Sequence, residues 1–266
     1  MDFLTEIISL KRARLEQSKE GCGIEAVRLQ ADSVRQNALP NALRAALKNS
    51  DRINVIAEFK RASPSKGVIR KDAEAAEIAR RYEAGGAAAV SVLTEEDRFQ
   101  GSLDDLRAVR AAVRLPILRK DFIFDEYQLY ESAAAGADAL LLIVAALNDE
   151  RLTRLLRTTE DELGMDALVE VHTKDEMRRA TDAGATVIGV NNRDLHSFNV
   201  SLEVSVQLAQ DSSIETLLVA ESGLSSAEDL RRLRALGYKG FLIGETLMRS
   251  AQPDTTLREL IVEAWT

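Results

Sequence analysis

The sequence predicts an α/β fold: a single (β/α)8 (TIM) barrel with an N-terminal helical extension. Eight short apolar, β-branched segments alternate with longer charged amphipathic segments, and the spacing leaves room for one helix and two loops each time. The strand segments are nearly continuous apolar runs, which is typical of parallel strands covered on both faces. The length of 266 residues also suits one such barrel.

The expected strands follow one another along the whole chain after its first fifty residues. They are residues 53–60, 87–94, 116–122, 137–145, 166–171, 186–192, 216–222 and 240–245. A glycine recurs shortly before several of them, as in AGADALLL, AGATVIGV and LGYKGFLIG. Glycine there can end a helix in the left-handed conformation without a Cβ penalty, so this phrase is a weak internal repeat.

Two of the expected helices begin with a capping-box pattern. Thr173 precedes Glu176, and Ser225 precedes Glu228, with the spacing that satisfies the free amides of a first helical turn. We therefore expect helices to begin at these two serine or threonine positions.

The first fifty residues do not follow the strand–helix alternation. Phe3, Leu4, Ile7, Ile8 and Leu15 form a helical apolar stripe beside a charged face, and a second helical stretch lies around ALPNALRAALKNS. We interpret residues 1–50 as an extension packed on a barrel of residues 51–266. The whole chain, 1–266, is then one domain.

Composition narrows the possible partners. Lys plus Arg total 35 and Asp plus Glu total 43, a net charge of −8, which argues against general binding of nucleic acid or an anionic membrane. A lone Cys22 cannot form an intramolecular disulfide, and two histidines rule out a His-rich metal site, although carboxylate-held Mg²⁺ stays open. The sequence shows neither a long apolar run nor a signal-peptide layout, so we expect a cytoplasmic protein. Since no unusual apolar stripe demands a partner, we expect a monomer.

Polar residues interrupt the apolar pattern where the expected strands end. In a (β/α)8 barrel these ends share one face, which carries the active site. Any one of them is explained by a solvated or salt-bridged strand end, but their convergence on one rim favours function. The residues are Glu58, Lys60, Lys120, Glu170, Asn191, Glu221 and Ser222.

The charges on this rim suit general acid–base chemistry. Glu58 and Lys60 are two residues apart on one strand, so their side chains share a face. Lysines and carboxylates crowded in one partly desolvated cup perturb each other's pKa values. A structural Glu–Lys pair that only neutralises itself remains the alternative for Glu58. For His172, on the same rim, we expect a structural role.

A phosphate site is the second signal. Gly223 follows the seventh strand and Gly244 the eighth, where backbone amides could hold an anion. The long first loop, FKRASPSKGVIRK, adds Ser63, Ser65 and five cationic residues from Lys60 to Lys71, a local positive patch that would attract an anionic substrate. The alternative is a turn glycine beside a solvated charge run.

Several motifs together resemble one enzyme family. AEFKRASPSKG, LTEEDRFQGSLDDL, LRKDFIFDEYQ, LVEVH, GVNNRDL, ESGL and FLIGETLM resemble the indole-3-glycerol phosphate synthase family, in the same order and on the expected strands. The resemblance covers essentially the whole chain, including the N-terminal helices. It implies a phosphosugar substrate, 1-(2-carboxyphenylamino)-1-deoxyribulose 5-phosphate, closed to indole-3-glycerol phosphate with loss of CO₂ and water in tryptophan biosynthesis. It implies no cofactor.

The resemblance also implies residue roles. Lys120 would protonate the ketone oxygen, and Lys60 would bind the substrate carboxylate. Glu170 would stabilise the cationic ring nitrogen or transfer protons, and Glu58 would orient Lys60 or share in dehydration, in which Lys60 would also assist. Which carboxylate is the base and which lysine donates the second proton stay open. Asn191 and Glu221 would hold hydroxyls and ammonium groups. The phosphate would lie among Ser222, Gly223, Gly244 and Ser63.

Further positions are assigned to substrate contacts by the same resemblance. Phe99, Phe122 and Leu142 would form an apolar slot for the aromatic ring, although each could be ordinary core. Arg193 would contact the substrate carboxylate or simply pair with Asp194. Glu245 must point away from the phosphate, since a carboxylate there would weaken anion binding.

Two other functions are weighed against this one. A phosphoribosylanthranilate isomerase-like barrel would use a Cys/Asp pair where this chain has Glu58, Lys60 and Lys120. A barrel kept only for binding would be expected to lack at least one rim lysine or carboxylate, and none is missing here.

Overall fold

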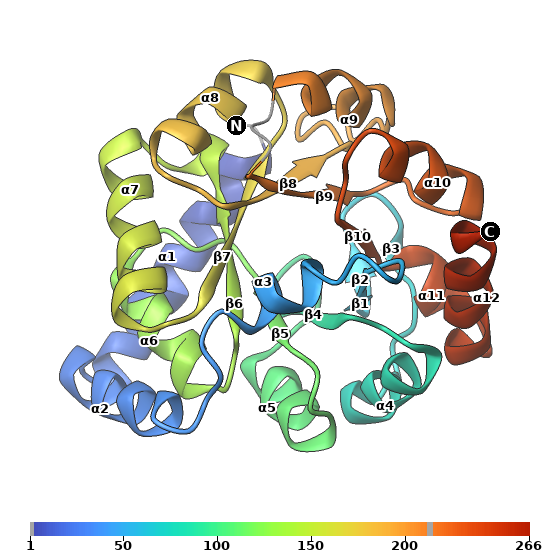
Figure 1. Ribbon diagram of the computed structural model, residues 1–266. Helices are drawn as coiled ribbons and strands as arrows, with labels where there is room; N and C mark the ends of the chain where they lie inside the picture. Colours follow the sequence, from blue (N-terminus) through green and yellow to red (C-terminus); the bar gives the residue numbers. More distant parts are fainter. Residues whose placement is uncertain (1–2, 212–214) are drawn as a thin grey trace.

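Eight parallel strands form a closed barrel, seen along its axis in Figure 1. The computed structural model describes residues 3–211 and 215–266. Neighbours around the barrel follow the chain, in the order β1-β10-β9-β8-β7-β6-β5-β4. Each predicted strand segment contains one of them, so the (β/α)8 prediction is confirmed. The strands are β1 (Val55–Phe59), β4 (Ala89–Leu93), β5 (Ile117–Lys120), β6 (Ala139–Ile143), β7 (Asp166–Val171), β8 (Val187–Asn191), β9 (Leu217–Glu221) and β10 (Gly240–Ile243).

Helices surround the barrel (Figure 1). They are α4 (Ala75–Gly85), α5 (Leu103–Ala112), α6 (Glu126–Ala134), α7 (Asp149–Arg157), α8 (Lys174–Asp182), α9 (Glu203–Leu208), α10 (Ala227–Ala235), the short α11 (Glu245–Arg249) and α12 (Pro253–Trp265). Short 3₁₀ turns η1 (Val144–Ala146) and η3 (Ala209–Asp211) and a π-helical turn η2 (Thr158–Glu162) complete the connections. The first loop contains an unpredicted antiparallel hairpin of β2 (Ala62–Ser63) and β3 (Gly67–Val68).

Helices begin near both predicted caps, but the predicted cap residue of the second helix is wrong by one position. Thr173 caps α8 by accepting from the Glu176 amide, but the Glu176 carboxylate accepts from the His172 amide, one residue before the cap. At α10 the box is formed by Ser226 and Asp229 instead of Ser225 and Glu228. Both pairs fit the pattern, and only the backbone path decides which serine is the cap.

The N-terminal segment packs against both ends of the barrel. It forms α1 (Phe3–Gly21), α2 (Ile24–Arg35) and α3 (Ala42–Leu47). Side chains of α1, such as Ile7, pack with Phe122 at the carboxyl ends of the strands, whereas Leu47 of α3 lies against Gly240 at their amino ends. The unpredicted α2 lies on the outside against α6.

Strand residues alternate between two cores. Ala57, Leu140 and Val169 pack between the barrel and its helices, and Ile56, Leu141 and Leu168 fill the barrel interior. This alternation decides which residue at each strand end faces the mouth of the barrel.

Candidate active site

The predicted charged residues face the mouth because of their register on the strands. Ile56, Leu118, Leu168 and Val219 fill the interior. The next residues on the same face, two positions further along, are Glu58, Lys120, Glu170 and Glu221. Four strands therefore deliver one ionisable group each to the carboxyl end of the barrel.

Lys120 is the centre of the cluster. Its Nζ lies 3.1 Å from Oε2 of Glu170 and 3.1 Å from Oε2 of Glu221. Both carboxylates are almost fully buried, at 2% and 1% exposed. One ammonium therefore bridges two carboxylates at the base of the cup.

A second pair lies beside the first. Nζ of Lys60 donates to Oε1 of Glu58 at 2.6 Å, and Glu58 is near enough to Lys120 to act on its charge. The structure thus brings together the two lysines and three carboxylates that the sequence placed on one rim.

Two glycines make room for these carboxylates. A Cβ at Gly244 would overlap Oε1 of Glu58 and lie 3.0 Å from Nζ of Lys60, and a Cβ at Gly189 would overlap Oε1 of Glu221. Gly189 was missed in the sequence because a glycine inside a strand gives no signal of what approaches it.

The cluster shifts the pKa values of its members in opposite directions. Burial disfavours the Lys120 ammonium, but Glu170, Glu221 and Glu58 outweigh burial and raise the pKa of Lys120. Burial likewise disfavours ionised Glu170, and Lys120 outweighs it and lowers the pKa of Glu170. Burial, joined by the charge of Glu170, raises the pKa of Glu221 to about 7. The two carboxylates that share one lysine therefore differ in proton affinity, as expected of a site that moves protons.

His172 belongs to this network more closely than the sequence predicted. Its Nε2 lies 3.4 Å from Oε1 of Glu170, and its Nδ1 lies 3.1 Å from Oε2 of Glu176. Burial alone would lower the pKa of His172, but the two carboxylates raise it to about 10. Glu170 therefore lies between two cations, Lys120 and His172. The sequence did contain a signal for this contact: His172 follows Glu170 by two residues, so both side chains lie on the same face of the chain.

Asn191 and Arg193 adjoin the cup at the end of β8. Asn191 lies near enough to Glu170 to help lower its pKa, and its Oδ1 accepts from the Arg193 amide at 3.0 Å. The Arg193 guanidinium donates to Oγ of Ser65 in the first loop at 3.2 Å. Asp194 accepts from the amides of His196 and Ser197 within its own loop. Arg193 thus bridges two loops at the mouth, and the alternative of an Arg193–Asp194 pair finds no support.

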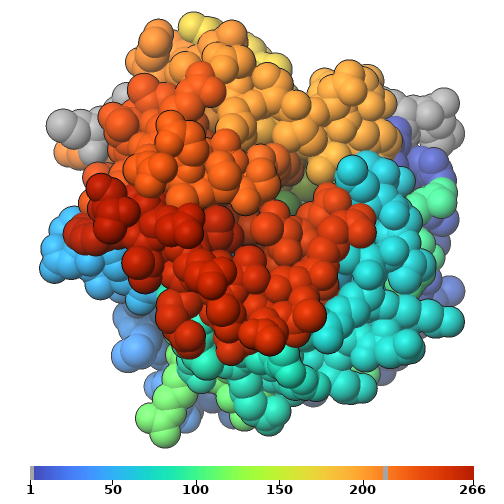
Figure 2. Space-filling view, turned by 90° about the vertical axis from the view of Figure 1, so that its right-hand side faces the viewer, coloured from blue at the N-terminus to red at the C-terminus, as the bar shows by residue number. Residues whose placement is uncertain are grey.

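The predicted phosphate residues surround the same mouth. Ser222 and Gly223, directly after β9, both have left-handed backbone, with φ of 64° and 79°. Gly244 precedes α11, and Ser63 ends β2 in the first loop. Figure 2 shows a hollow between the cyan first loop and the yellow-orange segment after β8.

The positive patch of the first loop is smaller than predicted. Arg61 turns to Asp105 with two bonds of 2.6 and 2.7 Å, and Lys60 pairs with Glu58. Nζ of Lys66 lies 3.9 Å from Oε1 of Glu245, which also accepts from Arg249 at 3.0 Å. The Glu245 carboxylate is therefore held by two cations.

An aromatic cluster lies beside the charged cup. The ring centroids of Phe99 and Phe122 are 6.4 Å apart, and Phe3 of α1 meets Phe122 edge-on at 6.3 Å. The assignment of Leu142 is wrong: it packs between the barrel and its helices, and Ile143 takes the inward position. Phe3 was missed because its place depends on how α1 crosses the barrel.

The loop after β4 holds a group of carboxylates. Glu95, Glu96 and Asp97 offer oxygen atoms within 4.8 Å of one another. Glu95 accepts three backbone amides, and Glu96 and Asp97 pair with Lys11 and Arg14 of α1. These contacts explain the cluster as the anchor of α1, so its donor set does not fit a metal site.

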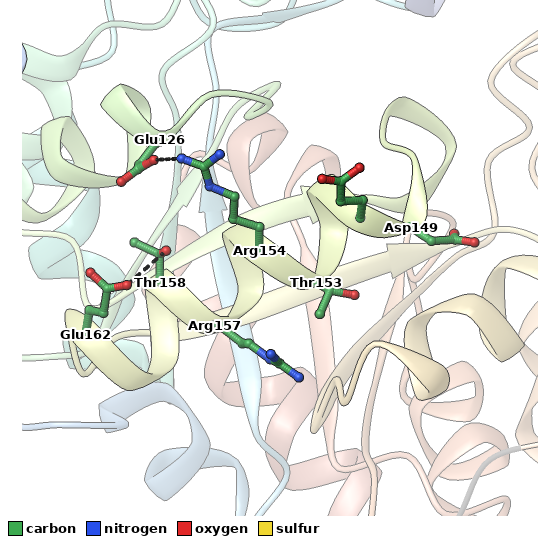
Figure 3. Close-up of a pocket in the computed structure, with 8 residues that line it drawn as sticks. Glu126, Asp149, Thr153, Arg154, Arg157, Thr158 and Glu162 are labelled. Atoms are coloured by element: carbon green, nitrogen blue, oxygen red, sulfur yellow. Dashed lines mark hydrogen bonds and ion pairs between the residues drawn. The ribbon is translucent and has the colours of Figure 1, made fainter.

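An open pocket of about 700 Å³ lies elsewhere, on the outer wall along α7 and η2 (Figure 3). Its polar side chains contact one another: Arg154 forms an ion pair with Glu126, and the Thr158 hydroxyl donates to Glu162. It contains none of the predicted site residues. The lining residues are Glu126, Asp149, Glu150, Thr153, Arg154, Arg157, Thr158 and Glu162.

Comparisons with known proteins agree with this geometry. Among the described residues, no helix is both long and apolar enough to cross a bilayer. In fold, the chain is similar to 3-hexulose-6-phosphate synthase from Salmonella typhimurium (TM-score 0.64, 12% identity, 80% of this chain and 100% of that one), a likeness that shows the fold alone.

Sequence relatives are much closer. The chain is 46% identical over 263 residues to indole-3-glycerol phosphate synthase of Carboxydothermus hydrogenoformans, covering 97% of this chain and 99% of that one. It is 51% identical over 224 residues to the enzyme of that name from Koribacter versatilis, covering 84% and 86%. The profile of the family described as indole-3-glycerol phosphate synthase matches residues 4–260. The chain belongs to the indole-3-glycerol phosphate synthase family.

Proposed function

We propose that the cup at the carboxyl end of the barrel is where this chain closes 1-(2-carboxyphenylamino)-1-deoxyribulose 5-phosphate to indole-3-glycerol phosphate. The family makes the chain a carboxy-lyase of tryptophan biosynthesis. One observation carries the assignment of the site: Nζ of Lys120 lies 3.1 Å from both Glu170 and Glu221, with the Lys60–Glu58 pair beside it.

Lys120 acts as the general acid in ring closure. The ring carbon that carries the carboxylate attacks the ketone carbon, and the carbonyl electron pair moves to oxygen, which takes a proton from Lys120. The ring nitrogen supplies electron density and becomes cationic, and Glu170 stabilises that charge. Because Glu170 keeps its negative charge between Lys120 and His172, it is suited to this role.

Loss of CO₂ and water completes the reaction. When CO₂ leaves, its bonding pair returns to the ring, restores aromaticity and neutralises the nitrogen. The new hydroxyl then takes up a second proton and leaves as water. A base removes a proton from the adjacent carbon, and the electron pair of that C–H bond forms the indole double bond. We assign this dehydration to Lys60 and Glu58, with Lys60 first holding the substrate carboxylate.

The remaining contacts orient the substrate. Asn191 and Glu221 hold hydroxyls; both Glu221 oxygens are buried, and Oε2 lies 3.1 Å from Nζ of Lys120. Ser222, Gly223, Gly244 and Ser63 surround the phosphate, supported by the left-handed backbone at 222 and 223. Phe99 and Phe122 contact the aromatic ring, and Arg193 its carboxylate.

The chain acts without a cofactor, as one domain of residues 1–266 and as a cytoplasmic monomer that binds no nucleic acid. Its net charge of −8 supports the last point, since polyanions are repelled at long range.

The test is to add the carboxyphenylamino ketose phosphate to the pure protein and follow indole fluorescence. Lys120→Ala should lower turnover by at least about 10²-fold, the scale of a positioned acid. Lys174→Ala, which removes an exposed lysine bound to Asp211 outside the barrel, should leave turnover unchanged. Absence of product with correctly folded protein would end the proposed function, and unchanged turnover in Lys120→Ala would remove only the role of Lys120.

A further inference from the structure

Three consecutive residues at the end of β5 point alternately away from the mouth and into it. Arg119 turns outward, where it bonds Glu131 at 2.8 Å and Oγ of Ser132 at 3.1 Å on α6. Lys120 turns inward to the cup. Asp121 turns outward again, so both neighbours of Lys120 in the chain are held on the far side of the strand.

Asp121 links two other segments of the chain to the end of β5 through its carboxylate. Its Oδ2 accepts from Oγ1 of Thr94 at 2.6 Å, Nζ of Lys11 at 2.7 Å and Nη2 of Arg119 at 3.0 Å. Its Oδ1 accepts from the amide of the next residue at 2.8 Å. Arg119, Asp121 and Lys11 are 1%, 2% and 5% exposed, so this network lies away from water.

Lys11 is the member of this network that comes from the N-terminal extension. Burial alone would raise the pKa of Asp121, but Lys11 and Arg119 lower it to about 2, so Asp121 is ionised at neutral pH. Lys11 also binds Oε2 of Glu96, at 3.0 Å, in the loop after β4. Charged hydrogen bonds in a low dielectric are strong and geometrically demanding. α1 is therefore fixed to the strand end that carries Lys120.

We propose that Lys11 is a positioning residue for Lys120: by holding Asp121, it fixes the end of β5 so that the Lys120 ammonium stays between Glu170 and Glu221. The inference rests on the proposed role of Lys120 as general acid. Lys11 itself bonds Asp121 and Glu96, behind the cup, so its loss should act on the chemical step more than on substrate binding.

A double-mutant cycle tests this coupling. Lys11→Met keeps the apolar stem and removes the charge, leaving Asp121 paired with Arg119. A displacement of about 1 Å can lower a rate by up to about 10²-fold, so we expect kcat to fall about 10-fold with KM within about 2-fold. In a Lys120→Ala background the same substitution should lower kcat no further, because its effect passes through Lys120. Lys11→Arg should restore most of kcat.

The matched control is Lys19→Met, on the same helix. Lys19 also pairs with a carboxylate of the barrel, Asp125, at 3.0 Å, but that residue lies at the start of α6. The kcat of Lys19→Met should equal that of the unmodified chain. Thr94→Val breaks the same network from the residue that follows β4 and should lower kcat in the same way, which covers the case of Lys11→Met failing to fold.

If Lys11→Met lowered kcat by the same factor in both backgrounds, the loss would be a general loss of structure and the inference would be overturned. A kcat within about 2-fold of the unmodified chain in both Lys11→Met and Thr94→Val would also overturn it. Unchanged kcat in Lys120→Ala alone would instead overturn the role of Lys120, which separates the two failures.

Discussion

Gly189 shows how closely a single residue constrains the cup. It lies on β8 next to β9, and a Cβ there would overlap Oε1 of Glu221 and lie 3.2 Å from a methyl of Leu168. Gly189→Ala should therefore displace the Glu221 carboxylate from Lys120. A displacement of about 1 Å in a catalytic group lowers turnover by roughly 10- to 100-fold.

Turnover of Gly189→Ala, measured by indole fluorescence, is compared with that of Gly21→Ala. A Cβ at Gly21 meets nothing within 4 Å, so that variant should keep full turnover. Full turnover in Gly189→Ala would mean that the position of Glu221 is not needed for the reaction.

His172 makes stability depend on pH in a specific direction. Its pKa in the folded chain, about 10, lies above the ordinary value of 6.5, so folding increases its affinity for a proton. The resulting stabilisation is fully present below about pH 6.5 and is lost as pH rises through about 10. The free energy of unfolding of the unmodified chain should therefore exceed that of His172→Gln, and the difference should be largest at the acidic end of this window.

Urea unfolding of both proteins at about pH 6, 8 and 10 gives this difference directly. Taking the difference removes the titration of groups that lie far from His172, since these are common to both chains. A difference that stays constant over the window would contradict a protonated His172 between Glu170 and Glu176.

At the scale of elements, the first turn of α10 separates two equally plausible caps. Ser226 accepts from the Asp229 amide, and the Asp229 carboxylate accepts from the Ser226 amide at 3.0 Å. Ser226→Ala should lower the free energy of unfolding by about 1 kcal/mol, the usual effect of losing an N-cap. Ser225→Ala, one residue earlier, is the matched control and should change it by only about a few tenths of that. Urea unfolding of both variants measures these losses. A larger loss in Ser225→Ala than in Ser226→Ala would support the capping register expected from the sequence.

Strand number and the charged strand ends could be predicted because they depend on local pattern. A charge such as Glu170 stands out within an apolar strand, and alternation then fixes its face. Leu142 could not be placed in this way, since β6 reads ALLLI and either register gives the same pattern. α2 escaped notice because only Val27 and Ala31 of it are buried, and Leu29 is 71% exposed. Contacts made by α1, including Phe3 and Lys11, depend on how a separate helix crosses the barrel.

On the scale of the whole molecule, the two ends of the barrel differ in purpose. The carboxyl end carries the buried carboxylates Glu58 and Glu170 around the partly buried Lys120, and such charges are costly to keep in a low dielectric. The amino end is closed by α3, whose Leu43 and Leu47 are fully buried in the interior core. In barrels of this class, residues at the amino end serve stability, and those at the carboxyl end serve catalysis.

Leu47→Ala should therefore weaken the fold without changing the reaction. Removing a fully buried leucine lowers the free energy of unfolding by about 2–5 kcal/mol, whereas kcat and KM, measured well below the melting temperature, should stay the same. Glu58→Gln, at the opposite end, is the complementary variant: its turnover should fall more than its stability, because it touches Lys60 in the cup. Urea unfolding and indole fluorescence on both variants measure the two effects. A loss of kcat in Leu47→Ala comparable to that in Glu58→Gln would mean that the cup depends on packing along the entire barrel axis.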